Sequence, residues 1–282
     1  MSRNYKSGVG LGIDVGATYI KYGLVTNSGK LLKLYQLPTP KNRRQFIKTL
    51  IKIIKTFQPD ITKVGIGLPG RINKQAGKII HYRDLPIANL AIVKLIKRQV
   101  NLPIKIDNDA RCFALAESLI GSAKNYQVVV GITIGTGVGG GLVINKKLFY
   151  GQGHAGEIGH QFIDFKRAKD WEDYLGAGKL KLTSTDYQKL ERLAKQKDKK
   201  ALRFWEQLGT IIGFGCLNII HVLNPDIIIL GGKQARAFKL FYPAMIKIIK
   251  KYCLIQPPKI VKSQLIDRAG IIGAALLFEI RK

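Results

Sequence analysis

The chain has 282 residues, 46% of them hydrophobic, which is enough for two domains with buried cores, and it shows neither an apolar stretch of about 18 residues nor a signal-peptide pattern. Its three cysteines (Cys112, Cys216 and Cys253) lie too far apart for a disulfide framework or a cysteine metal site, so we expect a reducing, cytoplasmic location. The net charge of +29 comes from lysines scattered at helical spacing, so we expect solvated helix faces, no membrane partner and no specific nucleic-acid partner.

The first part of the chain alternates strands and helices. Residues 8–39 predict three strands, with a glycine turn at Asp14–Gly16 between the first two. Residues 40–60 change to a helical period, with Phe46, Leu50, Ile53, Ile54 and Phe57 on one face. The remaining expected elements are a buried strand at 61–70, a helix at 88–103, a short strand at 104–109 and a helix at 110–121.

The second part starts again in the same style. Residues 127–135 and 141–151 predict a strand, a glycine turn and a strand, followed by helices at 186–196 and 201–223. A buried strand at 225–232 and a closing helix at 270–282 complete the chain. Both parts open with a hairpin and then cross over through helices to buried strands, which favours an α/β protein with two related lobes and a cleft between them.

Two glycine-rich turns occupy equivalent places, "GIDVGAT" at Gly12–Thr18 and "GTGVGGG" at Gly135–Gly141. Glycine lets the backbone approach a ligand closely and present its amide groups, and threonine hydroxyls add donors. Each turn alone is typical of an ordinary tight hairpin, and neither is a Walker A or Rossmann pattern. Together, the two turns predict that a chain of phosphates is bound from both sides. The carboxylate of Asp14 then predicts a Mg²⁺ between itself and the phosphates. A third glycine pair, Gly231–Gly232, ends a buried strand, where it is either a ligand-binding edge or a plain turn.

The segment "IKIDND" places three polar residues, Asp107, Asn108 and Asp109, just before a helix. Asp109 can be the N-cap of that helix, a frequent use of aspartate. It can instead take the proton from an attacking hydroxyl while Asn108 holds a neighbouring hydroxyl.

The segment "GQGHAGEIGHQF" carries His154, Glu157 and His160 in a glycine-rich loop. Without nearby cysteine or an HExxH helix, a metal site is disfavoured. Hydrogen bonds from Glu157 and His160 to a polyol are the better hypothesis, and a plain surface loop is the rival. Glu172 follows, by default as an exposed helix residue.

Several segments, in order, resemble the ROK (repressor, open reading frame, kinase) sugar kinases, of the superfamily of actin, Hsp70 and hexokinase. These segments are "GIDVGATYIKYGLV", "GIGLPGRINKQAGKI", "DNDARCFALAE", "GITIGTGVGGGLVINKKLFYGQGHAGEIGH" and "LNPDIIILGG". The fourth is the most specific, because it joins the second phosphate turn to the family's EIGH sugar motif.

The resemblance implies two ribonuclease-H-like lobes, of the actin and hexokinase type, closing on ATP and a hexose. Expected boundaries are 1–110 for the N-terminal lobe and 111–268 for the C-terminal lobe, with 269–282 packing back on the first. Asp109 would be the general base, and Asp14 would place Mg²⁺, through water. The sugar contacts would be Gly70, Asn108, Glu157, His160 and Glu172. The phosphate and nucleotide contacts would be Asp14, Gly16, Thr18, Lys21, Gly135, Thr136, Gly137, Gly231 and Gly232.

The chain departs from the family where a CxCGxxGC zinc loop usually follows the EIGH motif, because residues 159–178 contain no cysteine. We therefore expect no zinc, so His160 would contact the sugar without also binding a metal. We also expect Trp171 to pack beneath this loop and support it. The chain begins almost at its first strand, leaving no room for an added DNA-binding domain, which favours a kinase over a repressor.

The expected reaction is transfer of the γ-phosphoryl group of ATP to a sugar hydroxyl, O6 of glucose or of an N-acetylated hexosamine. Alternatives are a polyphosphate-dependent glucokinase, which would suit the positive charge, and a non-catalytic sugar-binding regulator. The family also suggests a homodimer, for which the sequence itself gives no sign.

Overall fold

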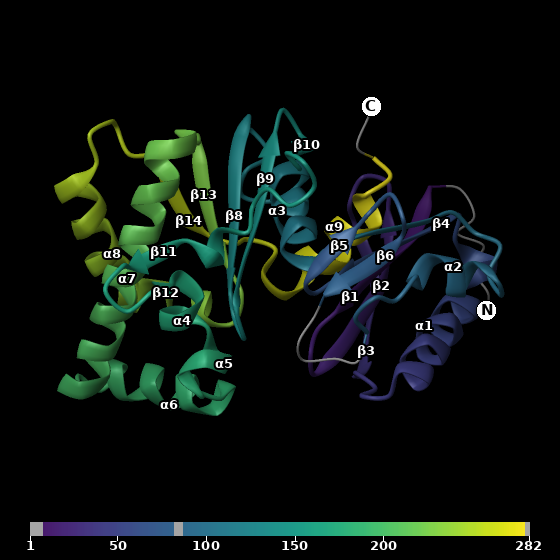
Figure 1. Cartoon of the computed structure of the whole chain (residues 1–282), viewed down its shortest axis with the longest axis horizontal. Helices are drawn as coiled ribbons and strands as arrows, with labels where there is room; N and C mark the ends of the chain where they lie inside the picture. Colours follow the sequence, from purple (N-terminus) through teal and green to yellow (C-terminus); the bar gives the residue numbers. More distant parts are fainter. Residues whose placement is uncertain (1–7, 82–86, 280–282) are drawn as a thin grey trace.

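The structure is a computed structural model that describes residues 8–81 and 87–279, and its core is two five-stranded sheets of identical connectivity (Figure 1). In each sheet a three-stranded antiparallel meander is extended by two parallel strands. The strand order is β3-β2-β1-β4-β7 in the first sheet and β10-β9-β8-β13-β14 in the second. The α/β architecture of two related lobes expected from the sequence is therefore confirmed.

The N-terminal sheet carries the first glycine turn at the joint of β1 and β2. Its strands are β1 (Val9–Val15), β2 (Tyr19–Thr26), β3 (Leu31–Pro38), β4 (Lys63–Leu68) and β7 (Ile104–Asn108). A small hairpin of β5 (Arg71–Asn73) and β6 (Lys78–His81), which the sequence pattern did not reveal, follows β4. Helices α1 (Arg43–Phe57) and α2 (Ile92–Lys97) and the 3₁₀ turn η1 (Gln58–Asp60) complete this lobe.

The C-terminal sheet carries the second glycine turn at the joint of β8 and β9. Its strands are β8 (Val128–Ile134), β9 (Val138–Ile144), β10 (Lys147–Leu148), β13 (Ile227–Gly231) and β14 (Lys259–Lys262). After β10 come η2 (Ile158–His160), the short pair β11 (Phe162–Asp164) and β12 (Lys169–Asp170), α4 (Trp171–Leu175), α5 (Ala177–Leu180) and α6 (Ser184–Lys195). The long α7 (Lys199–Leu223) precedes β13, and η3 (Gln234–Ala237) and α8 (Phe238–Tyr252) follow it.

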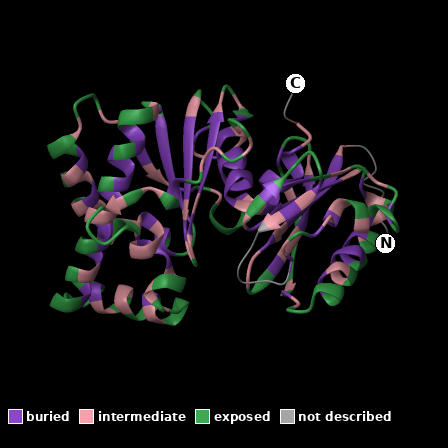
Figure 2. Cartoon of the chain, viewed as in Figure 1, coloured by how far each residue is buried: buried purple, intermediate pink, exposed green. Residues whose placement is uncertain are grey.

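Local signals explain the outer helices. The side chain of Asn42 caps α1 by accepting from the amides of Arg44 and Gln45, and the expected apolar face of α1 is buried from Phe46 to Ile54. The helix expected at 88–103 is much shorter, since α2 spans only Ile92–Lys97. Figure 2 shows the division that amphipathic periodicity predicts, with buried residues along both sheets and exposed residues on the outward faces of the helices.

Helix α7 is long and apolar enough by itself to cross a membrane, but half of its most apolar 18-residue window is buried inside the protein. Gly209 and Gly213 bring α7 into close contact with α8, and Gly215 receives the ring of Trp171. The apolar surface of α7 therefore belongs to the C-terminal core.

Two helices join the lobes, α3 (Asp109–Leu119) and α9 (Ala269–Leu276), the latter entered through η4 (Ile266–Arg268) (Figure 1). Helix α9 lies on β1 and β4 so closely that a Cβ on Gly65 would sit 1.7 Å from the carbonyl oxygen of Ala274. Helix α3 runs from the end of β7 onto the glycine-rich strand β9. The end of β7, where the catalytic aspartate was expected, thus faces the C-terminal sheet.

Candidate active site

The first glycine turn is fastened from outside through its carbonyl groups. The amide of Gly16 donates to the carbonyl of Tyr19 at 2.9 Å and closes the hairpin. The hydroxyl of Thr39 donates to the carbonyl of Gly16 at 2.7 Å, and the ammonium of Lys41 donates to that of Ala17 at 2.7 Å. The amide of Thr39 donates to the carbonyl of Thr18 at 2.9 Å. Because the carbonyls are engaged, an anion entering this turn meets amide groups.

The second glycine turn is fastened in the same sense by different groups. The amides of Ala177 and Gly178 donate to the carbonyls of Gly135 and Thr136, each at 2.9 Å. The amide of Val138 donates to Oε2 of Glu172 at 3.0 Å. The structure therefore places Glu172, expected as a sugar contact, against the second glycine turn.

The glycines of the second turn have two separate roles. A Cβ on Gly135 would meet no atom within 4 Å, so the space beside it is open. A Cβ on Gly137 would sit 2.3 Å from Oε2 of Glu172, and one on Gly139 or Gly141 would sit 2.7 Å from a methyl group of α3. Only the start of the run is free for a ligand, and the rest lets a side chain and a helix approach.

Asn108 and Asp109 lie where β7 becomes α3. Asn108 is the N-cap, accepting from the amides of Ala110 and Arg111 at 2.9 and 3.2 Å, so the alternative that Asp109 is the cap is wrong. The amide group of Asn108 donates to the carbonyl of Gly70 at 3.1 Å, which joins two expected sugar contacts. Asp109 is the first helical residue, where the helix N-terminus stabilises its charged form.

The carboxyl of Asp109 nevertheless has its pKa raised to about 7. Burial is the largest cause, followed by the charge of Asp14, with Glu157 adding a smaller repulsion, while the hydrogen bond from the amide of Ala110 opposes the shift. Burial likewise raises the pKa of Asp14 to about 6, partly offset by Lys21 and reinforced by Asp267. Carboxylates from both lobes thus share one poorly solvated region, an arrangement typical of catalytic sites.

Glu157 and His160 lie on the exposed loop before and within η2. Nδ1 of His160 lies 2.9 Å from Oδ2 of Asp170, a pairing that raises the pKa of His160 above its ordinary value. Trp171 is fully buried, as expected, and its indole N–H donates to the carbonyl of Ile211 at 3.1 Å. Within residues 8–81 and 87–279, no group of three or more His, Cys, Asp or Glu side chains is arranged to hold a metal ion.

The residues expected to contact the nucleotide lie at or near the ends of strands from both sheets. Thr18 and Thr136 are exposed at the tips of the two turns. Gly231 ends β13, and Gly232, with φ +84°, packs on the carbonyl of Ile134 next to the second turn. Lys21 is paired across the hairpin with Asp14.

Three polar contacts near the site were missed from the sequence. Asp107 is buried and accepts from the hydroxyl of Tyr150 at 2.6 Å, with the guanidinium of Arg111 at 3.6 Å. Gln234 is buried and donates to the carbonyl of Leu175 at 2.8 Å. Asp267 lies between Arg236 at 2.5 Å and Lys21 at 3.9 Å. Of these three residues, only Asp107 could have been singled out from the sequence, because it adjoins Asn108 and Asp109.

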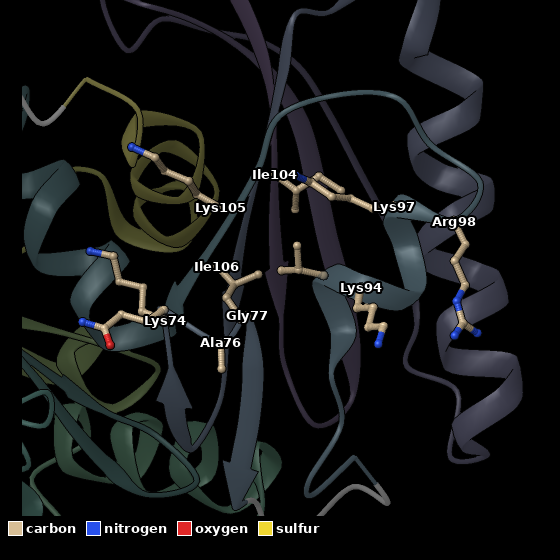
Figure 3. Close-up of a pocket in the computed structure, with 11 residues that line it drawn as sticks. Lys74, Ala76, Gly77, Lys94, Lys97, Arg98, Ile104, Lys105 and Ile106 are labelled. Atoms are coloured by element: carbon tan, nitrogen blue, oxygen red, sulfur yellow. The ribbon is translucent and has the colours of Figure 1, made fainter.

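A cavity of about 710 Å³ lies outside this region, between α2, β7 and the β5–β6 hairpin (Figure 3). It has five cations around it, but Figure 3 shows Lys74 and Lys105 pointing to one side and Lys94 and Arg98 to the other. The ammonium of Lys74 contacts the hydroxyl of Tyr150, and that of Lys105 donates to the carbonyl of Leu277. The cations do not converge, so we assign this cavity no role.

The fold and the site define a two-lobed protein of the actin and hexokinase type, and this chain belongs to the ROK family, whose model matches residues 10–281. The N-acetyl-D-glucosamine kinase of Histophilus somni is 31% identical, over 95% of this chain and 98% of that protein. A ROK family glucokinase from Streptomyces griseus, solved with glucose and AMPPNP, has a TM-score of 0.83 at 23% identity, covering 95% of this chain and 98% of its own. A ROK family transcriptional regulator, a homolog of the E. coli MLC protein, has a TM-score of 0.84 at 25% identity, covering 96% of this chain and 78% of its own.

Proposed function

We propose that this protein, a sugar kinase of the ROK family, transfers the γ-phosphoryl group of ATP to O6 of glucose or of an N-acetylated hexosamine. The observation that carries the proposal is Asp109, a carboxyl with its pKa near 7 at the junction of the two lobes, beside Asp14 from one and Glu157 from the other. The similarity to N-acetyl-D-glucosamine kinases supports the choice of acceptor.

In this proposal Asp109 accepts the proton of the sugar hydroxyl as that oxygen attacks phosphorus. General-base help of this kind is typically worth roughly 10²–10⁴-fold. Asn108, held by its contact with Gly70, and the exposed Glu157 and His160 would position the other hydroxyls. Positioning supplies most of the catalysis in phosphoryl transfer, because there is little covalent chemistry for the protein to perform.

The two glycine turns would hold the phosphate chain through amide groups and through the exposed hydroxyls of Thr18 and Thr136. Mg²⁺ takes one or two carboxylates together with phosphate oxygens and waters. Asp14 fits that requirement, because burial and the neighbouring Asp267 disfavour its charge and a cation would offset this cost. When bound, the ion would neutralise charge on the phosphates. A zinc site at His160 is disfavoured by the missing ligands, because residues 159–178 contain no cysteine.

The proposal is tested by ADP release over a hexose panel, with and without Mg²⁺, using ATP, GTP and polyphosphate as donors. Phosphorus NMR of the product identifies the hydroxyl that is modified. We expect Mg-dependent turnover with ATP and glucose or N-acetylglucosamine. Sugar binding without any turnover would instead support a regulator. Faster turnover with polyphosphate than with ATP would show that polyphosphate is the phosphoryl donor.

A further inference from the structure

Residues 170–178, here called the brace segment, contact both the predicted sugar histidine and the second glycine turn. At one end the carboxylate of Asp170 meets the ring of His160. In the middle Glu172 accepts from the amide of Val138, and at the other end Ala177 and Gly178 donate to the turn carbonyls. One short stretch of chain therefore touches the sugar side and the phosphate side of the site.

The two carboxylate oxygens of Asp170 have different partners. Oδ1 accepts from the amide of Asp173 at 2.9 Å, and this hydrogen bond caps α4. The carboxylate of Asp173 accepts from the amide of Asp170 in turn, which completes a capping box. Oδ2 lies 2.9 Å from Nδ1 of His160. The cap fixes the carboxylate, so the second oxygen holds a defined position in front of the imidazole.

A carboxylate accepts hydrogen bonds only, so Nδ1 of His160 must carry the proton. In the neutral ring Nε2 is then left as an acceptor. The side chain of His160 is 62% exposed, against 20% for Asp170, so the far edge of the ring can meet a ligand hydroxyl. The pairing with Asp170 also raises the pKa of His160, with Glu172 and Glu157 adding to the effect and burial opposing it. Nε2 is therefore an acceptor where the pH exceeds this raised pKa, and the tautomer is compared there.

The brace segment is anchored to the core at its second residue. Trp171 is fully buried, its indole N–H donates to the carbonyl of Ile211, and its ring fills the space above Gly215 of α7. The backbone amide of Trp171 also donates to the carbonyl of Gln161, directly after His160, at 2.9 Å. The position of Asp170 is thereby set by packing against α7.

We infer that Asp170 is a positioning residue for phosphoryl transfer: it fixes the ring orientation and the tautomer of His160 so that Nε2 accepts from a sugar hydroxyl. This inference rests on the proposed function for the identity of the ligand. Because Asp170 also begins the helix that holds Val138, the same residue keeps the sugar histidine and the second turn in one arrangement.

Three variants of the full chain separate these roles. Asp170→Asn retains an oxygen for the cap, since asparagine is as good an N-cap as aspartate, but turns an amide N–H toward Nδ1. Asp170→Ala removes both the cap and the pairing. Asp173→Asn is the matched control, because it removes a charge from the same helix without touching His160.

The first readout is nitrogen-15 NMR of the imidazole in the sugar-free protein, assigned with His160→Gln. We expect a proton on Nδ1 in the wild type and in Asp173→Asn, and on Nε2 in Asp170→Asn. An unchanged tautomer in Asp170→Asn overturns the inference.

The second readout is steady-state kinetics with N-acetylglucosamine and with glucose. We expect Asp170→Asn to raise the sugar KM roughly tenfold, the loss expected for one hydrogen bond, and to leave the ATP KM within about twofold. Asp170→Ala should raise both constants. A changed tautomer with an unchanged sugar KM also overturns the inference. If the wild type phosphorylates no hexose, the proposed function fails, while the NMR result still decides whether Asp170 sets the ring.

Discussion

The two glycine turns occupy equivalent places in equivalent sheets, and both are fastened through their carbonyls, yet the fastening groups differ. The first turn is held by Thr39 and Lys41 from the coil after β3. The second is held by backbone amides of Ala177 and Gly178 and by the carboxylate of Glu172. Equivalent topology therefore fixes where each glycine turn lies, and unrelated local contacts stabilise it.

The difference has a chemical side as well. The carboxylate at the base of the first turn, Asp14, has its pKa raised by burial, and we propose that it binds the metal. The carboxylate at the second turn, Glu172, already accepts from the amide of Val138. The second turn shares its support with His160, the expected sugar contact, through the brace segment. Under the proposed function, the first turn would serve the metal and the second would align the phosphate with the sugar.

The largest effect is expected at Asp109, which belongs to neither turn. Asp109→Asn should lower kcat by about 10²–10⁴-fold, the range for a lost general base, because the amide cannot accept the proton. Calorimetry should show ATP and sugar binding largely unchanged. Near-normal sugar phosphorylation by this variant would remove Asp109 from the mechanism.

Asp14→Asn tests the metal role of the first turn. We expect turnover to fall and the Mg²⁺ concentration for half-maximal activity to rise at least about tenfold, because the neutral amide attracts the cation less strongly. Sugar affinity, measured in the absence of nucleotide, should stay the same. If the metal requirement does not change, Asp14 does not place the ion.

A matched pair of variants distinguishes the two kinds of glycine in the second turn. Gly137→Ala introduces a Cβ against the carboxylate end of Glu172, which must move away from the amide of Val138, and should cost about 1 kcal/mol of stability, the usual value of one hydrogen bond. Gly135→Ala enters open space, so its stability should change by less than about 0.5 kcal/mol. Its ATP KM should rise, because the methyl group occupies phosphate space. Unchanged ATP binding by Gly135→Ala would show that no phosphate lies there.

The pKa of about 7 at Asp109 predicts an acid limb in the pH profile of kcat/KM, since the base must be unprotonated. Because this folded-state pKa lies above the ordinary value of 3.8, the native state binds an extra proton between the two, and the cost of Asp109 to stability is greatest above pH 7 and is lost as the pH falls. Carbon-13 NMR of the carboxyl should show a lower pKa in Asp14→Asn. An equal pKa in both proteins would contradict the coupling.

The smallest effect is expected from Thr39→Val, which removes one hydrogen bond from the first turn. The loss should be about 1 kcal/mol, seen in chemical unfolding, with a modest rise in the ATP KM. The second turn offers the contrast, because the carbonyls of Gly135 and Thr136 accept from main-chain amides, which side-chain substitutions other than proline leave in place. The side chain of Gln234 adds a longer contact to the carbonyl of Gly135, at 3.4 Å. A larger rise in the sugar KM than in the ATP KM would show that the first turn also contributes to sugar binding.

Chain-local patterns determined much of this protein. Alternation and glycine punctuation located the paired hairpins, and the helical period of residues 40–60 located α1, because these patterns depend on neighbouring residues. The order of the motifs identified the ROK family and the fold. The last part of the closing helix expected at 270–282 falls on residues 280–282, which lie outside the described residues. Residues 82–86 also lie outside them.

Tertiary structure alone decided the contacts between distant segments. Nothing local to Asp109 indicates that its pKa lies near 7, because the shift comes from burial between lobes and from Asp14 nearly a hundred residues earlier. The partners of His160 and Glu172, and the reason for glycine at 137, 139 and 141, likewise depend on elements that meet only in the folded chain. Sequence patterns report each residue's own backbone preference and periodicity, whereas burial and charge coupling are properties of the space that several elements enclose.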